Sequence, residues 1–566
     1  MFIDMNVNKA TYYHPTPWDT VFEPMSLPDM LERTVRHDPT APFLHFLGRS
    51  YCYRETFKEA NRFAQGLIAL GIKPGDRIGL FLPNVPIYAS AYYGAMMAGA
   101  VVVNFSPLYT VEELAWQVGD SGARLLVTLD VPELYNNAAK VLEASDLETL
   151  VVGRLSDMLP WYKGAALKLL KRSQIANVAY GTAIRSWRDV LGEWLWQDWL
   201  DGKAPSLPPV SADDLALLQY TGGTTGRPKG AMLGHNQLSM NAQQVAAINP
   251  FGNPRDEVFM GALPFFHVFA NTALLNHAVV SGASIAMVPR FETKQVLQTI
   301  AKYRATGFPG VPTMFQAMLD HPDLVRTDLS SLKVCISGGA PMPAPVHDRF
   351  EEVTGVRVVE GYGLTESSGV VSANPYAGTR KKGTIGQLVA GTEIVLLDKE
   401  DPSRLAREGE PGELAVHGPQ VMRGYWNHPE TAEDVFVMRD GKQWLRTGDV
   451  ATIDDEGFIS IVDRIKDMIA VGGFKVFPSV VEDVILQHEA VKEALVIGVP
   501  DDYLGEVPRV YVVLQPGADV GGDTLKGWLN DRIGKHERAD KVVVRADLPK
   551  TIIGKLDRKA LRAEVL

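Results

Sequence analysis

Two long uncharged runs constrain the fold of this chain of 566 residues more than any other feature. The runs cover residues 78–111 and 258–289, and each is longer than the roughly 20 residues that a membrane-spanning helix needs. The first run is broken by prolines and asparagines and separates into a strand IGLFL, a helix PIYASAYYGAMMAG and a strand AVVVNF. The second separates in the same way, with a helix expected from about 265 to 280. We therefore predict buried β-α-β units of a parallel sheet covered on both faces, and no transmembrane segment.

The same alternation of strands and helices organises most of the chain. It runs from about 26 to 210 and again from about 215 to 374, which predicts two doubly wound α/β lobes. Short strands separated by turns in 383–462 indicate a small β subdomain. The remaining residues, 465–566, are typical of a small α+β domain. The predicted fold class is α/β, with a large N-terminal domain over 1–464 and a small C-terminal domain over 465–566.

Composition excludes several classes of protein. A net charge of −11 argues against a surface built to neutralise nucleic acid, so we expect no nucleic-acid partner. The two cysteines, Cys52 and Cys335, cannot form a disulfide framework and lack the spacing of a zinc site. The first residues contain no apolar stretch of the kind found in signal peptides, which makes the cytoplasm the expected compartment.

One basic and apolar segment departs from the alternation. Residues 158–172 read MLPWYKGAALKLLKR, and five of the ten tryptophans lie between positions 161 and 199. A helix of this composition can lie on an anionic membrane surface, which would make the protein peripheral on the inner membrane. It can also be a helix packed on the large domain, and this second interpretation is favoured because the apolar and charged positions do not separate cleanly.

A glycine-rich segment, residues 220–231, has the composition of a phosphate-binding loop. It reads YTGGTTGRPKGA and follows the apolar strand LALLQY. Glycines allow backbone N–H groups to approach an anion, threonine hydroxyls add donors, and a lysine adds charge. The pattern is not that of a Walker loop. The residues expected to bind phosphate are Thr221, Gly222, Gly223, Thr224, Thr225, Gly226 and Lys229.

This loop resembles the phosphate loop of the adenylate-forming superfamily, which contains acyl-CoA synthetases, luciferases and the adenylation domains of peptide synthetases. Four more segments resemble the motifs of that superfamily in the same order: EGYGLTESSG (360–369), WLRTGDVATIDDEGF (444–458), VDRIKDMIAVGGFKVFPSVVE (462–482) and PKTIIGKLDRKALR (549–562). Together they cover the chain from about residue 215 to its end. The segments TGGTTG (221–226) and LPFFHVF (263–269) are most similar to those of bacterial long-chain fatty-acid CoA ligases.

The resemblance implies a role for each matching residue. Glu366 and Thr224 would hold Mg²⁺, whose preferred ligands are oxygens, and Thr365 would contact the α-phosphate. Lys555 would stabilise the charge that develops during adenylation, and His267 would lie near the acyl carboxylate, although an ordinary core histidine is an equal alternative. Lys466 would be the hinge of a mobile small domain. The other residues expected to contact nucleotide, CoA or the acyl tunnel are Gly339, Ala340, Glu360, Gly361, Tyr362, Gly363, Asp449, Arg464, Gly472 and Gly473.

The activity implied is a two-step ligation in which ATP activates a long-chain fatty acid to acyl-AMP and CoA then takes the acyl group. The small-molecule partners would be the fatty acid, ATP, Mg²⁺ and CoA. Three alternatives stay open: a ligase for a medium-chain or dicarboxylic acid, an acyl-AMP ligase that delivers to a carrier protein, and a non-catalytic acyl-binding protein on a membrane surface. A homodimer is also left open.

Overall fold

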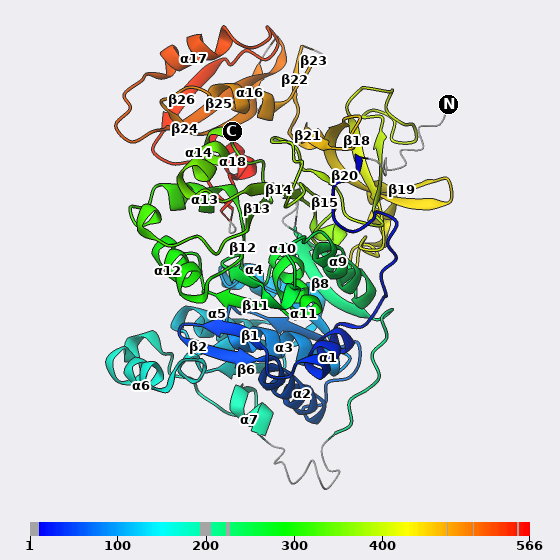
Figure 1. Ribbon diagram of the computed structural model, residues 1–566, viewed down its shortest axis with the longest axis vertical. Coiled ribbons are helices and arrows are strands. Elements are labelled where there is room, and N and C mark those ends of the chain that lie inside the picture. Colours follow the sequence, from blue (N-terminus) through cyan, green and yellow to red (C-terminus); the bar gives the residue numbers. More distant parts are fainter. Residues whose placement is uncertain (1–10, 193–204, 222–226, 473, 502, 552–553) are drawn as a thin grey trace.

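The computed structural model describes residues 11–192, 205–221, 227–472, 474–501, 503–551 and 554–566. Figure 1 shows a large domain built of two sheets and flanking helices, a small β subdomain beside it, and a small C-terminal domain above. The α/β fold class, with a large N-terminal and a small C-terminal domain, is confirmed. The helices of the large domain are α1 (Leu27–His37), α2 (Tyr53–Ala69), α3 (Pro86–Met97), α4 (Val111–Ser121), α5 (Pro132–Ala144), α6 (Trp161–Leu170), α7 (Trp187–Gly192), α9 (His235–Ala247), α10 (Val268–Ala270), α11 (His277–Ser281), α12 (Thr293–Tyr303), α13 (Pro312–Leu319) and α14 (Ala344–Thr354).

The first large sheet has seven strands in the order β7-β6-β5-β3-β4-β8-β9. All neighbours are parallel except the last pair, which forms an antiparallel hairpin. Helix α3 crosses between β3 and β4, and all twelve of its residues are buried, as the first uncharged run predicts. The strands are β3 (Arg77–Leu80), β4 (Val101–Asn104), β5 (Ala123–Leu129), β6 (Thr149–Gly153), β7 (Ile184–Ser186), β8 (Leu215–Thr221) and β9 (Lys229–Gly234).

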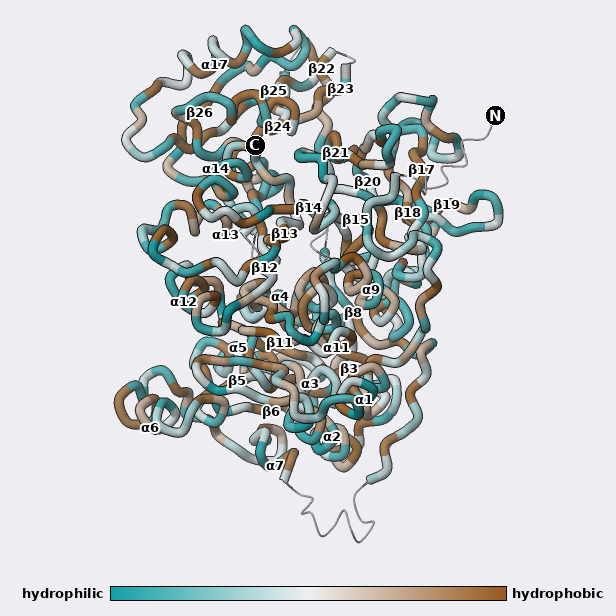
Figure 2. Tube along the Cα trace, viewed as in Figure 1, coloured by the Kyte–Doolittle hydropathy of each residue, from teal (hydrophilic) through white to brown (hydrophobic). Residues whose placement is uncertain are grey.

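The second large sheet has nine strands in the order β16-β15-β14-β13-β12-β10-β11-β1-β2. One hydrophobic core connects the two large sheets, and brown, apolar segments concentrate there in Figure 2. The strands are β1 (Pro42–Phe46), β2 (Arg49–Cys52), β10 (Val258–Gly261), β11 (Ser284–Met287), β12 (Gly307–Gly310), β13 (Val334–Gly338), β14 (Val358–Tyr362), β15 (Ser372–Ala373) and β16 (Gln387–Leu388).

The two sheets exchange strands across the predicted lobe boundary, so residues 26–210 and 215–374 are not self-contained lobes. Strands β1 and β2 join the second sheet, where Leu44 pairs with Ile285, and β8 and β9 complete the first. The alternation of apolar segments identifies strands but carries no information on their distant pairing partners. The helix expected from 265 to 280 also differs: it begins at Val268 and contains a π-helical turn, Asn271–Asn276, before α11.

The β subdomain and the small domain complete the chain. Helix α15 (Ala432–Val435) accompanies a sheet of β17 (Glu393–Leu397), β18 (Gly412–His417), β19 (Phe436–Arg439), β20 (Lys442–Ile453) and β21 (Ile459–Arg464). The small domain has its own core and contains β22 (Ile469–Val471), β23 (Phe474–Val476), α16 (Pro478–Ile485), β24 (Val491–Asp501), β25 (Gly505–Leu514), α17 (Gly522–Asn530), β26 (Lys541–Arg545) and α18 (Arg558–Val565). Among the described residues, no helix is long and apolar enough to cross a membrane.

Candidate active site

The candidate site lies where the small domain meets the ends of strands from the large domain. Thr221 and Lys229 are paired residues of the β8–β9 hairpin, so the glycine-rich segment connects two antiparallel strands. Gly222, Gly223, Thr224, Thr225, Gly226 and Gly473 lie outside the described residues. The 360–369 motif begins on β14, and β20 and β21 carry Asp449 and Arg464.

Lys555 enters the large domain and is not the exposed tip that its sequence suggests. The preceding Gly554 lies so close to α13 that a Cβ on it would be 3.0 Å from the hydroxyl of Thr313. A Cβ placed on Gly339, just after β13, would lie 2.7 Å from Cε and 3.0 Å from Nζ of Lys555. Backbone and side-chain hydrogen bonds between Thr551 and Lys555 hold the turn. The side chain of Lys555 therefore occupies the space that a side chain at position 339 would need.

The surroundings of Lys555 shift two protonation equilibria. Burial lowers the pKa of Lys555 to about 8, with Arg464 acting in the same direction and Asp449 opposing both. Burial, and then the charge of Lys555, lowers the pKa of His267 to about 3, so its imidazole is neutral at physiological pH. Nδ1 of His267 accepts a hydrogen bond from the N–H of Phe269 at 3.3 Å, which leaves the proton on Nε2. His267 thus caps α10 and keeps one ring N–H free to donate.

Asp449, Arg464 and Tyr362 form one hydrogen-bonded cluster. Asp449 is 3% exposed, and one of its carboxylate oxygens lies 2.9 Å from Nε of Arg464, its direct cross-strand partner. The other oxygen accepts a hydrogen bond from the hydroxyl of Tyr362. Both oxygens are thereby oriented within the protein, and each keeps a second lone pair for a hydroxyl donor.

Sequence reasoning missed Tyr425, which joins Glu366 to Lys229 of the β8–β9 hairpin. Its hydroxyl donates a hydrogen bond of 2.6 Å to Glu366, and the ammonium of Lys229 lies 5.5 Å from its ring centroid. A backbone bridge between Ala231 and Tyr425 fixes the ring in this place. The tyrosine belongs to a loop, residues 418–428, with no motif that spacing could have identified.

Several other predicted residues have visible packing roles. Glu360 accepts hydrogen bonds from the backbone N–H groups of Met342 and Gly383, both at 3.2 Å, and burial raises its pKa. A Cβ on Gly363 would lie 1.9 Å from the carbonyl oxygen of Gly369, so only glycine fits there. The motif is thus held tightly by its own backbone. Gly361 pairs with Ala373 on β15, Thr365 begins a short 3₁₀ helix that includes Glu366, and Ala340 is half-buried after β13.

The predicted hinge and CoA residues are not gathered at this site. Lys466 is exposed in the short turn between β21 and β22. Gly472 is exposed at the β22–β23 hairpin, with a φ of +55°, and its N–H donates to Leu504. Figure 1 places that hairpin at the outer end of the small domain, whereas the chain before α18 reaches down toward α13. The arrangement brings Lys555, and not Gly472, to the nucleotide motifs.

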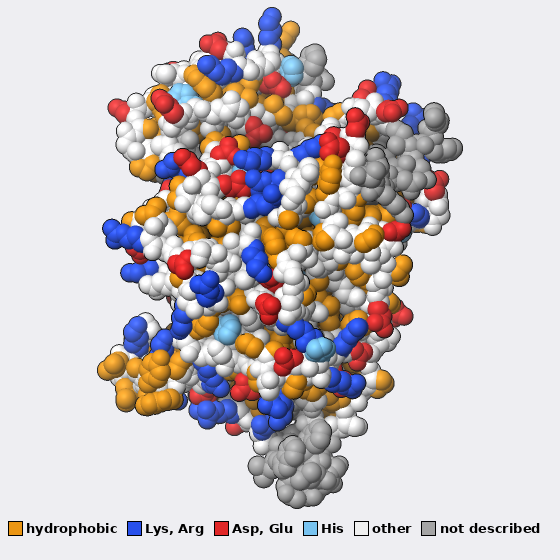
Figure 3. All heavy atoms as spheres, viewed as in Figure 1, with side chains coloured by type: hydrophobic (Ala, Val, Ile, Leu, Met, Phe, Trp, Pro, Cys, Tyr) orange, Lys and Arg blue, Asp and Glu red, His pale blue; other side chains and the backbone are white. Residues whose placement is uncertain are grey.

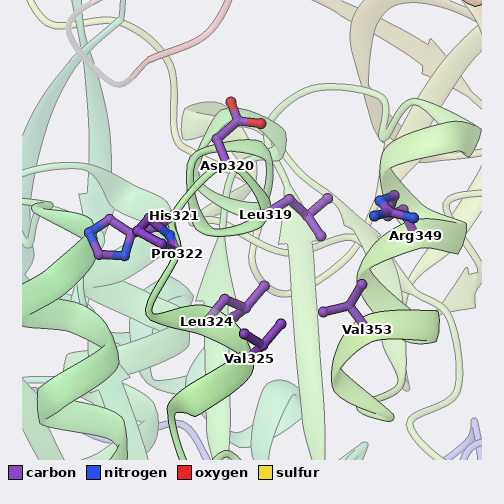
Figure 4. A pocket seen from close by; sticks show the side chains of 8 residues that line it. All are labelled: Leu319, Asp320, His321, Pro322, Leu324, Val325, Arg349 and Val353. Carbon is purple, nitrogen blue, oxygen red and sulfur yellow. The ribbon is translucent and has the colours of Figure 1, made fainter.

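A surface hollow of about 240 Å³ between α13 and α14 is separate from these residues. Figure 4 shows side chains from both helices converging on it, with the carboxylate of Asp320 turned away from its floor. Its lining contains none of the predicted site residues: Leu319, Asp320, His321, Pro322, Leu324, Val325, Arg349 and Val353. It is not the site of adenylation chemistry.

The two-domain α/β fold, with Lys555 of the small domain set against the large domain near Asp449 and Arg464, is that of an adenylate-forming enzyme. Residues 31–426 match the family model described as AMP-binding enzyme, and residues 480–555 match its C-terminal domain. The chain belongs to the AMP-binding enzyme family and is an acyl-CoA ligase of its AMP-forming type.

Relatives and solved structures cover almost the whole chain. A long-chain-fatty-acid–CoA ligase of Bacillus subtilis (strain 168) is 36% identical over 564 residues, covering 98% of this chain and 97% of the relative. A feruloyl-CoA synthase of an Amycolatopsis species is 34% identical, covering 94% and 97%. ATP-bound MatB from Rhodopseudomonas palustris has a TM-score of 0.82 at 29% identity, covering 95% and 98%. A benzoate CoA ligase from Burkholderia xenovorans LB400 has a TM-score of 0.80 at 27% identity, covering 96% and 100%.

Proposed function

We propose that this ligase activates a long-chain fatty acid. In the first step the fatty carboxylate attacks the α-phosphorus of ATP, giving acyl-AMP and releasing pyrophosphate. In the second step the thiolate of CoA attacks the acyl carbon and AMP leaves with its phosphate oxygen, giving the thioester. No enzyme nucleophile is required, because the acyl-adenylate is itself the activated intermediate.

The observation that carries this proposal is the position of Lys555 beside Gly339 and within electrostatic reach of His267. A cation held there can stabilise the carboxylate and the charge that builds up at the α-phosphate. The neutral His267, with its Nε2 proton, can donate to a carboxylate oxygen. Asp449 and Arg464 would orient the ribose, and Lys229 would face the phosphates.

The residues around Gly339 and His267 are largely apolar, which favours a substrate with a hydrocarbon chain. A Cβ on Gly338 would touch the ring of Phe269 at 3.0 Å, and one on Gly339 would lie 3.7 Å from Val311. Phe265 and Val268, on either side of His267, are buried. Burial, and then the charge of Lys555, lowers the pKa of His267, as expected for a histidine in apolar surroundings. Relatives that this chain covers over 94–97% of their length carry the name long-chain-fatty-acid–CoA ligase, which supports the same substrate class.

The residues present also fit Mg²⁺ bound to ATP. Among the described residues no group of three or more acidic, histidine or cysteine side chains could hold a metal ion, and Mg²⁺ in ATP sites commonly takes further ligands from phosphate and water. Glu366 would supply the protein carboxylate, oriented by Tyr425, and Thr224 would be the second ligand. The ion, when bound, neutralises charge on the phosphates.

An aromatic acid is a second candidate, because the feruloyl-CoA synthase relative is almost as similar over the whole chain. The remaining alternatives are a medium-chain or dicarboxylic acid and transfer of the acyl group to a carrier protein. A cytoplasmic location and a homodimer are further proposals.

A substrate ladder tests the assignment directly. Purified enzyme is given ATP, Mg²⁺ and saturated fatty acids of increasing length, a dicarboxylic acid or a ferulate-type acid, and AMP release is measured with and without CoA. We expect CoA-dependent turnover that peaks among the long chains. Lys555→Ala should lower the rate by at least about a hundredfold, as expected when a group that stabilises transition-state charge is removed.

A matched lysine variant controls for general damage. Lys550, five residues earlier on the same segment, pairs with Glu493 of the small domain, so Lys550→Ala should retain most of the activity. A maximum with the aromatic acid would replace the proposed substrate class. Pyrophosphate release that does not respond to CoA would indicate delivery to a carrier protein, and no turnover with any acid would reject the ligase.

A further inference from the structure

Helix α6 carries an exposed apolar surface that the ligase reaction does not use. Trp161 is 85% exposed, Leu169 81% and Leu170 82%, and Tyr162 is also exposed. Figure 3 shows a hydrophobic patch at one corner of the large domain, over the position of α6 in Figure 1. The helix packs on the domain, as the favoured interpretation expects, but this packing leaves its large apolar side chains facing outward.

The helix nevertheless has a fixed orientation. Gly164 is its only buried residue and lies so close to the preceding 3₁₀ turn that a Cβ would be 2.5 Å from the carbonyl oxygen of Ser156. Lys163 donates a hydrogen bond of 2.7 Å to the carbonyl of Leu47, before β2. At 100° per residue, Trp161, Ala165, Leu169, Tyr162, Ala166 and Leu170 follow one another around one half of the helix, and Gly164 and Leu167 lie on the other half. The apolar and charged positions do not separate cleanly in the sequence because Leu167 is apolar but lies on the half of the helix that faces the protein.

Positive charge borders this apolar half on both sides. Lys163 lies at one edge and Lys168 at the other, and Lys171 and Arg172 follow the helix as exposed residues. The segment 151–192 contains seven lysines and arginines against two aspartates, a net charge of +5 in a chain whose total is −11. One of those aspartates, Asp157, is paired with Arg188 at 2.8 Å. The corner is thus basic as well as apolar, unlike the chain as a whole.

We propose that α6 docks this enzyme onto the surface of an anionic phospholipid bilayer. Tryptophan and tyrosine suit the boundary between headgroups and acyl chains, leucines can enter the acyl region, and the flanking lysines can contact anionic headgroups. A second copy of the chain is disfavoured as the occupant, because a symmetric contact through this face would place +5 against +5. Fatty substrates partition into such a bilayer, so docking would also bring the enzyme to its proposed substrate, but the docking surface does not depend on that assignment.

Vesicle sedimentation tests the proposal with the full-length enzyme. The wild type is mixed with vesicles of phosphatidylcholine alone or of phosphatidylcholine and phosphatidylglycerol, at low and high salt. We expect binding to the mixed vesicles that weakens as salt screens the lysines, and at least a tenfold weaker partition for Leu169→Glu with Leu170→Glu. Turnover of a short, water-soluble acid by this variant should stay at the wild-type rate, which shows that it is folded.

A control with the same charge change separates the patch from general charge effects. Val325 and Met438 are 77% and 69% exposed and lie on other parts of the molecule. The pair Val325→Glu with Met438→Glu should bind vesicles as the wild type does. Failure of the wild type to bind either vesicle overturns the proposal, and so does equal binding by the α6 variant. A dimer in lipid-free solution that only the α6 variant loses would assign the patch to a second copy instead.

Discussion

Lys492 of the small domain forms an ion pair with Asp320 of the large domain, with 2.8 Å between Nζ and Oδ2. Asp320 caps the end of α13, and Thr313, near the start of the same helix, is the residue that Gly554 approaches. The small domain therefore touches α13 at both of its ends. Two contacts on one helix define the orientation in which Lys555 reaches Gly339.

Breaking this ion pair should slow adenylation modestly. The two side chains are 23% and 49% exposed, so the pair contributes no more than about 1 kcal/mol, or about fivefold in rate. We expect Lys492→Ala to reduce pyrophosphate release in the absence of CoA by two- to fivefold. Under the expected hinge role of Lys466, the small domain turns away for the second step, so thioester formation from supplied acyl-AMP should not fall. Exchanging the charges, Lys492→Asp with Asp320→Lys, should restore part of the loss, and a loss that persists would argue against the pair.

Gly339→Ala should displace Lys555. Gly339 has a φ of +84°, and its new Cβ would lie 2.7 Å from Cε of Lys555. Adenylation should fall by tenfold or more, whereas thioester formation from supplied acyl-AMP should be retained. Gly71→Ala is the control, because Gly71 has the same φ and no atom within 4 Å of its Cβ position. It carries the same backbone strain, of order 1 kcal/mol, without the clash. Equal losses in both variants would mean that strain alone is responsible.

The sequence predicted local structure well and distant pairing poorly. Asp449 and Arg464 stand on adjacent strands of one hairpin, so their proximity follows from a short connection and strand alternation. The pairing of Leu44 with Ile285 joins strands more than 200 residues apart, and no periodic pattern specifies it. Tyr425 was missed for the same reason, since its partner Glu366 is 59 residues earlier. The outward apolar face of α6 stood only as the less favoured alternative, because periodicity shows which residues share a face and not which face meets the protein.

The rate of adenylation should depend on pH through Lys555. Its pKa is about 8, and only the ammonium form can stabilise negative charge, so kcat/KM for ATP should fall as the pH rises through about 8. His267 has a pKa of about 3 and stays neutral throughout, so it adds no further step. Lys555→Arg keeps its charge at every pH tested and should remove the fall, although its absolute rate will be lower. A fall at the same pH in that variant would assign it to another group.

Tyr425→Phe should weaken the use of MgATP without unfolding the site. The change removes the hydrogen bond of 2.6 Å to Glu366 but keeps the ring that Lys229 contacts. A hydrogen bond to a charged group is worth about 1.5–3 kcal/mol, so the apparent KM for MgATP should rise by about tenfold or more. Pyrophosphate release measured against Mg²⁺ and ATP concentration gives this value. Tyr51→Phe is the matched control, because its hydroxyl donates to the carbonyl of Met158, far from the nucleotide motifs. Unchanged dependence on MgATP in Tyr425→Phe would show that Glu366 needs no such support, and the tyrosine would then serve only the packing of its loop.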